Sequence, residues 1–303
     1  MAQTLVQARL LSTDVLQRGV IETFARTSPV MELLPFMTIA GNSYQYNVEE
    51  TLPDVDYRDV NQGYEESTGT VSQKQESLVM LGGDVDVDKF IVKTLGNVSD
   101  QRAIQTNMKV KRLSNQFTKD FFKGDKAKNP LAFNGLDVRL AENNQVVEAG
   151  GVLTLQNLRE LLDMVEGGAD VLFMSKAMQR ELFTIATQGK HNYIYEGKDA
   201  FGRHVSMFGD VPIRVVEDSV LGFNENGETA SVYAVKFGAQ EYVSGLTNGG
   251  IMVEDIGELE TKPVYRTRIE FYVGLAAFHP KSAARLSGIT RAGAKVVTPD
   301  PEV

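Results

Sequence analysis

The chain has 303 residues, of which 42% are apolar and 23% are charged, as is typical of a folded globular protein with a sizeable core. It contains no cysteine and only three histidines, His191, His204 and His279. Disulfides, thiolate metal sites and cysteine nucleophiles are therefore excluded. The sequence has no apolar run of about 18 residues and no secretory signal pattern at its start, so we expect no membrane span and no membrane partner.

The net charge of −9 is unevenly distributed along the chain. Residues 49–88 contain eleven acidic and two basic residues, so this window carries a charge equal to that of the whole chain. Residues 99–128 contain eight basic and three acidic residues. The acidic balance argues against a general nucleic-acid-binding protein, because such proteins carry a basic excess. The two windows instead favour charge pairing between two parts of this chain, within one subunit or between copies.

The first 42 residues are predicted to form an arm. Pro29 and Pro35 interrupt the segment, and its apolar residues follow no regular period. A short amphipathic helix is expected within it, from about Thr13 to Ala25. Arms of this kind need a second surface that covers their apolar side.

Residues 43–92 have the pattern of a long β-hairpin, because apolar and polar residues alternate in both of its arms. The middle of the hairpin, 54–73, is acidic and too polar to bury itself. A loop of this length is uncommon inside a compact domain, so we expect a projecting two-stranded loop. Its acidic residues are candidates for docking onto a basic surface: Asp54, Asp56, Asp59, Glu65 and Glu66.

Three further acids, Asp84, Asp86 and Asp88, alternate along the returning arm. Period-two spacing places all three carboxylates on one face of a strand. Such a row could hold a hard cation such as Ca²⁺. The interpretation we favour is a solvated strand face, with Val85 and Val87 directed inward, and the cation site is left as the alternative.

The strongest helix prediction covers residues 98–124. Ser99 suits the N-cap, and Gly124 suits the position after the last turn. Residues spaced three and four apart form one apolar stripe: Ala103, Thr106, Val110, Leu113, Phe117 and Phe121. Such a length, well above the mean of about 11–12 residues, suggests a structural spine. Its basic residues are the candidate partners of the acidic loop: Lys109, Lys111, Arg112 and Lys119.

The rest of the chain has a mixed helix and strand pattern. Thr154 and Ser175 are expected to cap two short helices. Residues 189–203 have the composition of a polar loop. The predicted strands are 169–174, two within 205–216 around a Gly and Pro turn, 231–237, 241–244 and 263–278.

Catalytic motifs are nearly absent from the sequence. It contains no nucleotide-binding glycine loop, no GxSxG nucleophile motif and no HExxH zinc motif. His191 and His204 flank the polar loop that contains Asp199, and a His/Asp base pair there would be the basis of an enzyme. A solvated loop is the simpler interpretation. We therefore expect no catalytic, cofactor-binding or metal-binding residue and no cofactor.

The order of these parts resembles that of the major capsid proteins of tailed bacteriophages, the HK97-like family. An arm, a projecting two-stranded loop, a spine helix and an α/β lobe that returns through a long strand follow one another in both. Three local patterns are similar to segments of that family: Phe208–Asp218, with its strand–turn–strand around Val211-Pro212; Ala234–Gly238; and Arg268–Leu286, with Gly274 and the ending Phe278-His279-Pro280-Lys281-Ser282-Ala283.

The resemblance implies an α+β fold divided as the family is divided. In this sequence the N-terminal arm would be 1–42, and the extended loop, or E-loop, 43–92. The peripheral (P) domain would comprise 93–139 and 261–290, with the spine helix at 98–124. The axial (A) domain would be 140–260, and the C-terminal tail 291–303.

The resemblance also implies a function. The chain would be a non-enzymatic shell protein that assembles through hexamers and pentamers into an icosahedral phage head, located in the virion and assembled in the host cytoplasm. A separate scaffolding protein, a portal and a decoration protein would be its partners, and packaged DNA would be contacted only non-specifically. The alternatives are an encapsulin-like nanocompartment shell and, from a different class, a soluble two-domain hydrolase.

Overall fold

The computed structural model describes residues 20, 23, 28–94, 98–188, 194–198, 204–223 and 229–291. In these ranges no helix is long and apolar enough to cross a membrane. The helix predicted over 13–25, Asp199 and the tail after Arg291 lie outside the described residues, apart from isolated positions of the arm.

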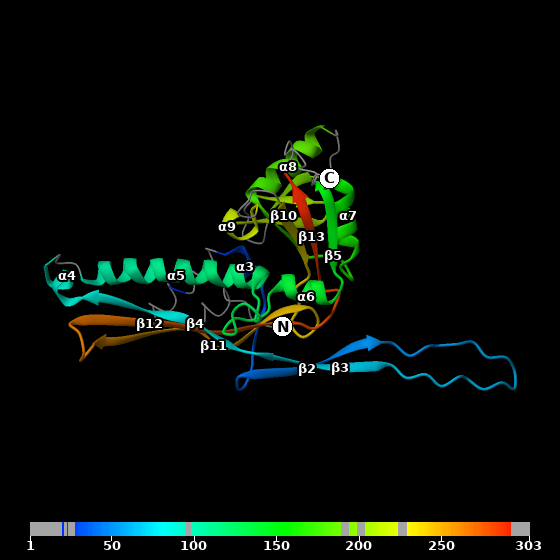
Figure 1. Ribbon diagram of the computed structural model, residues 1–303, viewed down its shortest axis with the longest axis horizontal. Coiled ribbons are helices and arrows are strands. Elements are labelled where there is room, and N and C mark those ends of the chain that lie inside the picture. Colours follow the sequence, from blue (N-terminus) through cyan, green and yellow to red (C-terminus); the bar gives the residue numbers. More distant parts are fainter. Residues whose placement is uncertain are drawn as a thin grey trace, which may run out of the picture.

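A four-stranded sheet and one long helix form the lower body of the molecule in Figure 1. The strand order is β1-β11-β12-β4, with β1 parallel to β11 and the other pairs antiparallel. Helix α5 lies along one face of this sheet (Figure 1). The elements of this body are α3 (Pro29–Leu33), β1 (Phe36–Thr38), β4 (Val79–Asp88), α4 (Lys89–Thr94), α5 (Val98–Lys123), α6 (Leu136–Glu142), β11 (Val243–Glu258) and β12 (Val264–Ala277).

A seven-stranded mixed sheet forms the upper body, in the order β5-β13-β10-β6-β9-β8-β7. Every residue of its central strand β6 (Val171–Ser175) is buried, because helices cover both faces. Leu172 and Met174 face the core under α7 and α8, whereas Val171 and Phe173 face the core that includes α5. The other elements are β5 (Val146–Val152), α7 (Leu155–Asp163), α8 (Lys176–Gln188), β7 (Ile194–Lys198), β8 (His204–Phe208), β9 (Val211–Val216), α9 (Asp218–Leu221), β10 (Thr229–Val235) and β13 (Ala283–Thr290).

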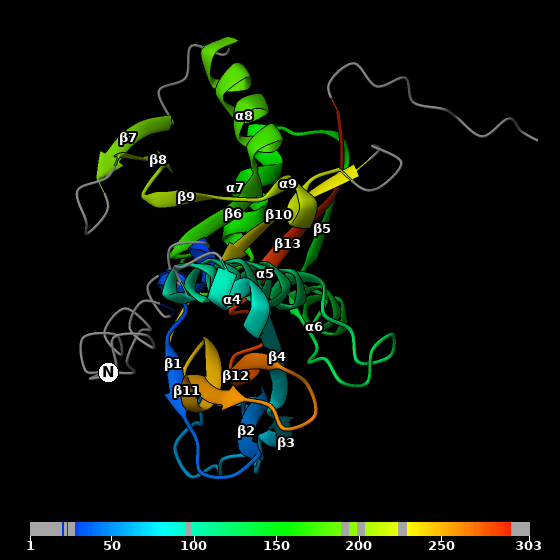
Figure 2. The same ribbon diagram turned by 90° about the vertical axis from the view of Figure 1, so that its left-hand side faces the viewer.

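The hairpin is separate from both sheets. β2 (Ser43–Thr51) pairs only with β3 (Thr70–Ser77), in an antiparallel register that starts at Ser43 opposite Ser77. Figure 1 shows the pair leaving the lower body and continuing into a long loop that extends far from the rest of the molecule. Figure 2, turned by 90°, shows the two bodies one above the other, with β2 and β3 at the lower end.

The hairpin predicted over 43–92 is shorter than expected. Its returning arm ends at Ser77, and β4 belongs to the four-stranded sheet, where it pairs with β12 along its whole length. The alternation that suggested one long arm is real, but it serves two sheets in succession. A period of two cannot distinguish them, because it reports a buried face and not the partner that buries it.

Strand pairing differs from three further expectations drawn from the sequence. Strand β11 extends to Glu258 and pairs with β12, although the sequence placed residues up to 260 with the upper lobe. Conversely, β13, expected in the lower body, pairs with β10 and β5 in the seven-stranded sheet. A strand, β7, also lies within the predicted polar loop 189–203 and pairs with β8.

Helix α5 begins at Val98 and ends at Lys123, within one residue of the predicted range. The apolar stripe is buried from Thr106 to Phe121, but Ala103 is exposed. Phe117 is central to this packing, because its ring contacts Phe36, Phe133 and Phe271 at centroid distances of 6.0–6.4 Å. Helix, arm and sheet are therefore held by one aromatic cluster.

Gly124 ends α5 for a reason that differs from the expected one. Its φ is not positive, and the requirement for glycine is a close backbone approach. The Gly124 amide donates to the carbonyl of Asp120 at 2.8 Å, and its carbonyl accepts from the Gly135 amide at 2.9 Å. A Cβ at Gly124 would lie 2.4 Å from the Asp120 oxygen and 2.5 Å from the Phe133 oxygen.

Gly124→Ala is therefore expected to lower the free energy of unfolding by about 1–3 kcal/mol, because the new methyl group meets backbone atoms that cannot rotate away. Thermal unfolding followed by circular dichroism measures the change. The matched control is Gly63→Ala in the projecting loop, where a Cβ meets nothing within 4 Å. Equal melting temperatures for the two variants would contradict this account of the turn.

Candidate functional site

The end of the hairpin is entirely exposed. All residues from Thr51 to Thr70 are solvent-exposed, and we call residues 52–69 the loop tip. Local contacts hold it, including a bond of 2.8 Å from the Ser67 hydroxyl to the Asp54 carbonyl and one of 2.7 Å between the Thr51 and Thr70 hydroxyls. These contacts order the strands, but they bury no apolar surface.

Large apolar side chains are spread along this exposed tip. The exposed fractions are 90% for Val55, 106% for Tyr57 and 82% for Val60, with Leu52 and Tyr64 also exposed. Five large apolar side chains are thus exposed on one thin segment, which makes the tip a candidate contact surface. The sequence analysis considered only the acids of the tip and missed these residues, although their spacing among the acids was visible.

The predicted acidic residues are all in the tip and all exposed. None of Asp54, Asp56, Asp59, Glu65 and Glu66 forms an ion pair with another residue that the structure describes. The Asp59 carboxylate accepts a local bond from the Val60 amide, at 2.7 Å. The carboxylates are therefore available to a partner outside the subunit.

The predicted basic residues on α5 divide into two groups. Lys111, Arg112 and Lys119 are exposed. Lys109 is half-buried and lies over β4, where its Cε would be 2.5 Å from a Cβ on Gly83. Its charge also helps to lower the pKa of Asp84, so Lys109 has an internal role.

The tip and α5 do not meet within one subunit. Figure 1 shows the tip projecting away from the body, on the side opposite to the N-terminal half of α5. The exposed face of α5 also carries Ile104 and Met108, with exposed fractions of 51% and 60%. Both lie outside the predicted stripe, one helical turn apart, and the sequence analysis missed them. Basic and apolar groups thus share this face of α5, as acidic and apolar groups share the tip.

The acids of β4 are occupied by arginines of β12. Arg268 Nε donates to Asp84 Oδ1 at 2.8 Å, and Arg266 makes two bonds of 2.6 Å to Asp86. Hydrogen bonding from these arginines lowers the pKa of both carboxyls. Asp88 Oδ1 accepts from the Phe90 amide at 2.7 Å at the start of α4. Val85 and Val87 are buried, as the strand-face interpretation expected, but the carboxylates of Asp84 and Asp86 on the other face are paired with arginines.

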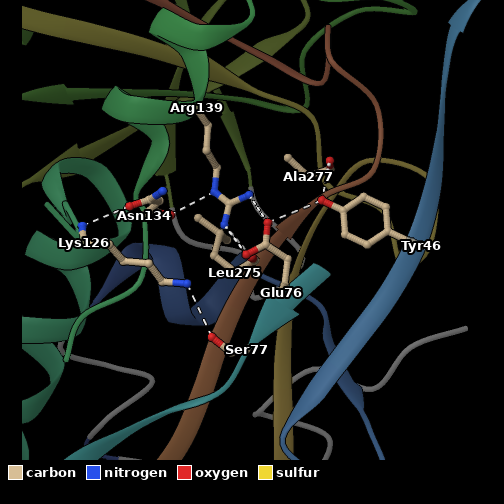
Figure 3. A network of polar contacts seen from close by, with 8 residues as sticks. All are labelled: Tyr46, Glu76, Ser77, Lys126, Asn134, Arg139, Leu275 and Ala277. Atoms are coloured by element: carbon tan, nitrogen blue, oxygen red, sulfur yellow. Dashed lines mark hydrogen bonds and ion pairs between the residues drawn. The ribbon is translucent and has the colours of Figure 1, made fainter. Parts of the chain in front are cut away.

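The root of the hairpin contains a buried ion pair (Figure 3). Arg139 of α6 donates to both carboxylate oxygens of Glu76 on β3, at 2.5 and 2.8 Å. The two side chains are only 10% and 12% exposed. The Tyr46 hydroxyl, on β2, lies 3.5 Å from the same carboxylate and donates to the Ala277 carbonyl at 3.2 Å. No sequence signal pointed to this contact, because its members are far apart in the chain.

Two of the three histidines, His204 and His279, lie among the described residues. His204 is exposed on β8. His279 Nδ1 accepts from the Lys281 amide at 3.2 Å, and its Nε2 lies 3.7 Å from Glu166. His191 and Asp199, the other members of the hypothetical base pair, lie outside the described residues.

Tyr46 makes the root sensitive to alkaline pH. Burial, followed by the charge of Glu76, raises the pKa of Tyr46 to about 12 from 10.0. Because the pKa is raised in the folded state, protonated Tyr46 stabilises the folded protein fully below pH 10, and this stabilisation is lost as the pH rises towards 12. We expect the free energy of unfolding to fall by roughly 2–3 kcal/mol across this range. Urea unfolding at a series of pH values from pH 9 upward measures this fall. Tyr46→Phe should remove the part of the pH dependence that is due to Tyr46. The same pH dependence in the variant and the parent would contradict this assignment.

Comparison with known proteins supports the architecture. The model of the family described as major capsid protein GP7 matches residues 13–157. No curated protein matches the sequence at a significant level. The SrpI encapsulin complex of Synechococcus elongatus is similar over 96% of this chain and 97% of its own, with a TM-score of 0.68 and 17% identity.

Two further structures are similar as well. A structure from Microbacterium phage Oxtober96 covers 87% of this chain and 90% of its own, with a TM-score of 0.60 and 14% identity. The capsid of an empty GTA particle covers the same shares, with a TM-score of 0.60 and 12% identity. Residues 13–157 thus match the major capsid protein GP7 family, and the whole chain has the α+β, HK97-like fold that the order of its parts predicted.

Proposed function

We propose that this chain is the major capsid protein of a tailed bacteriophage, which assembles through hexamers and pentamers into the icosahedral head shell around the genome. The observation that carries the proposal is the loop tip, a long projecting segment with acidic and apolar side chains that no other described part of its own subunit covers. The match to a major capsid protein family supports the same function. In this role the chain is a structural protein without catalytic residues.

The strand pairing suggests how the chain divides into capsid domains. We assign the E-loop to 43–77 and the P domain to the four-stranded sheet with α5 and α6. The A domain is the seven-stranded sheet with its helices, including β13. These assignments differ from the predicted boundaries at 92 and 260 because β4 and β11 pair within the lower sheet. The arm remains 1–42 and the tail 291–303.

The tip is proposed to lie over the exposed face of α5 in a neighbouring subunit. Asp54, Asp56, Asp59, Glu65 and Glu66 would face Lys111, Arg112 and Lys119, whereas Lys109 is engaged within its own subunit. Apolar side chains of the tip would cover Ile104 and Met108. Charge pairing would set the register of the two copies, and apolar contact would supply much of the binding free energy.

An encapsulin-like nanocompartment shell is the second candidate. The similarity to the SrpI encapsulin complex, which extends over nearly the full length of both chains, favours it. The two candidates differ in content, since a phage head contains DNA and a nanocompartment contains protein cargo. Nucleic-acid and protein analysis of purified shells distinguishes them. A hydrolase has no support among the described residues.

As a phage head protein the chain would reside in the virion after assembly in the host cytoplasm. A separate scaffolding protein, a portal and a decoration protein are its proposed partners. The net charge of −9 suits a shell that contacts packaged DNA only non-specifically.

Shell assembly is the first test of this function. Sedimentation and negative-stain microscopy of the purified chain, over a concentration series and with genes adjacent to its own co-expressed, should show rings of subunits or closed shells. A variant in which Asn-Gly replaces the loop tip should keep the β2–β3 ladder, because that turn suits a two-residue hairpin, and should fold but not form shells. Compact monomers of the unmodified chain under all these conditions would overturn the proposal.

Charge exchange tests the proposed contact. Changing Lys111 and Arg112 to Glu should reduce assembly, more at low salt than at high salt, because salt screens exposed pairs. Changing Glu65 and Glu66 to Lys should act in the same way. All four changes together restore the net charge, and since every subunit carries both surfaces, assembly should recover. Lys176→Glu with Arg180→Glu on α8 is the control for altered charge. Failure of the fourfold variant to recover would contradict direct pairing.

A further inference from the structure

The hairpin is attached to the body over a short stretch. On its apolar side, Tyr46 packs edge-on against Phe278 with ring centroids 4.7 Å apart, and Tyr44 and Val48 of β2 pack into the same cluster. Beyond Val48 and Lys74, the side chains of the hairpin whose burial is described are exposed, apart from the half-buried Ser72. Orientation of the whole projecting segment is therefore decided at its root.

Arg139 is held in place by the body, independently of the hairpin. Its Nε donates to the Asn134 carbonyl at 2.8 Å, and its Nη2 donates to the Leu275 carbonyl at 2.9 Å. Asn134 lies just before α6 and Leu275 lies on β12, so both acceptors belong to the lower body. The remaining guanidinium donors point at Glu76, as Figure 3 shows.

Glu76 is the matching group on the hairpin. A bidentate pair between guanidinium and carboxylate fixes angle as well as distance, because two parallel bonds must be satisfied together. Apolar packing is non-directional, and the other polar contacts of the root are single bonds, from the Tyr46 hydroxyl to the Ala277 carbonyl at 3.2 Å and from Lys126 Nζ to the Ser77 hydroxyl at 3.4 Å. A buried ion pair is also strongly favoured to remain closed, since opening it leaves a charge without a partner.

A small change in the angle of the hairpin at its root would move its far end by a large distance. From Glu76 to Thr70 the strand rises about 3.3 Å per residue, so the end of the ladder lies roughly 20 Å from the ion pair. A tilt of about 10° at the root would then move that end by roughly 3–4 Å, and the tip by more. A displacement of that size exceeds the range of a hydrogen bond, about 2.7–3.2 Å between heavy atoms.

We propose that Arg139 and Glu76 form a clamp that fixes the direction of the hairpin in the free subunit, so that the tip is already oriented when it meets a neighbouring copy. Arg139 acts as a positioning residue and touches no neighbour itself. Orientation before binding lowers the entropic cost of association. The effect on assembly rests on the proposed function, whereas the effect on hairpin direction concerns the single subunit.

Spin-label distances test the direction without reference to assembly. The chain has no cysteine, so Val71→Cys on the hairpin and Lys119→Cys on α5, both exposed, give two unique labelling sites. Labelled subunits are mixed with excess unlabelled subunits, so that only distances within one chain are measured. The parent should give one narrow distance distribution. Glu76→Gln should broaden it or shift its maximum by several ångströms.

The control is Glu148→Gln, the same change at an exposed site on β5, which should leave the distribution unchanged. Arg139→Lys keeps the charge but loses the bidentate geometry, and it should broaden the distribution as well. Circular dichroism must show that each variant is folded. If Arg139→Lys is unfolded, the test relies on Glu76→Gln, in which Arg139 keeps its bonds to Asn134 and Leu275. A parent-like distribution in Glu76→Gln would overturn the clamp.

Assembly of the same variants separates the two claims. We expect Glu76→Gln to lower the yield of closed shells by several-fold, with little dependence on salt because the pair is buried. A broadened distance distribution with full shell yield would overturn the role in assembly and leave the clamp. Failure of the parent to form shells, with distances that respond to Glu76→Gln, would count against the proposed function alone.

Discussion

A two-stranded segment without a core of its own depends on its attachment to the rest of the subunit, and this constraint organises the molecule. An isolated hairpin is marginally stable in water, yet here it projects with its apolar side chains exposed. Its direction comes from the root, where Tyr46 packs on Phe278 and Arg139 binds Glu76. Its exposed surface calls for a partner, and the proposed partner is a second copy of the same chain.

The lower body provides the support for that root. Helix α5, β1 and β12 meet at Phe117, so the helix and the two strands pack as one unit. The close approach at Gly124 and Gly135 directs the chain from the end of α5 into α6, which carries Arg139. Packing in the core and orientation of the exposed hairpin are thus parts of one structure.

Local patterns predicted the individual elements well. The spacing of Val110, Leu113 and Phe117 predicted α5. The hydroxyls of Thr154 and Ser175 cap their helices as expected, since each accepts a hydrogen bond from a backbone amide three residues later, at 3.1 and 3.2 Å. The sequence did not reveal that β4 and β11 both pair with β12. Alternation along a strand reports that one face is buried, but not which strand lies beside it. Strand partners are distant in sequence, and no single-chain periodicity encodes them.

The sequence by itself determined the acidic loop, the basic helix and the order of parts that indicates a shell protein, because these depend on composition and local spacing. Only the tertiary structure decided which of those charges are free. Asp84 and Lys109 are engaged inside the subunit, whereas the tip acids and Lys111 face solvent. It also brought Arg139 to Glu76, because burial and pairing depend on which distant segments the fold places side by side.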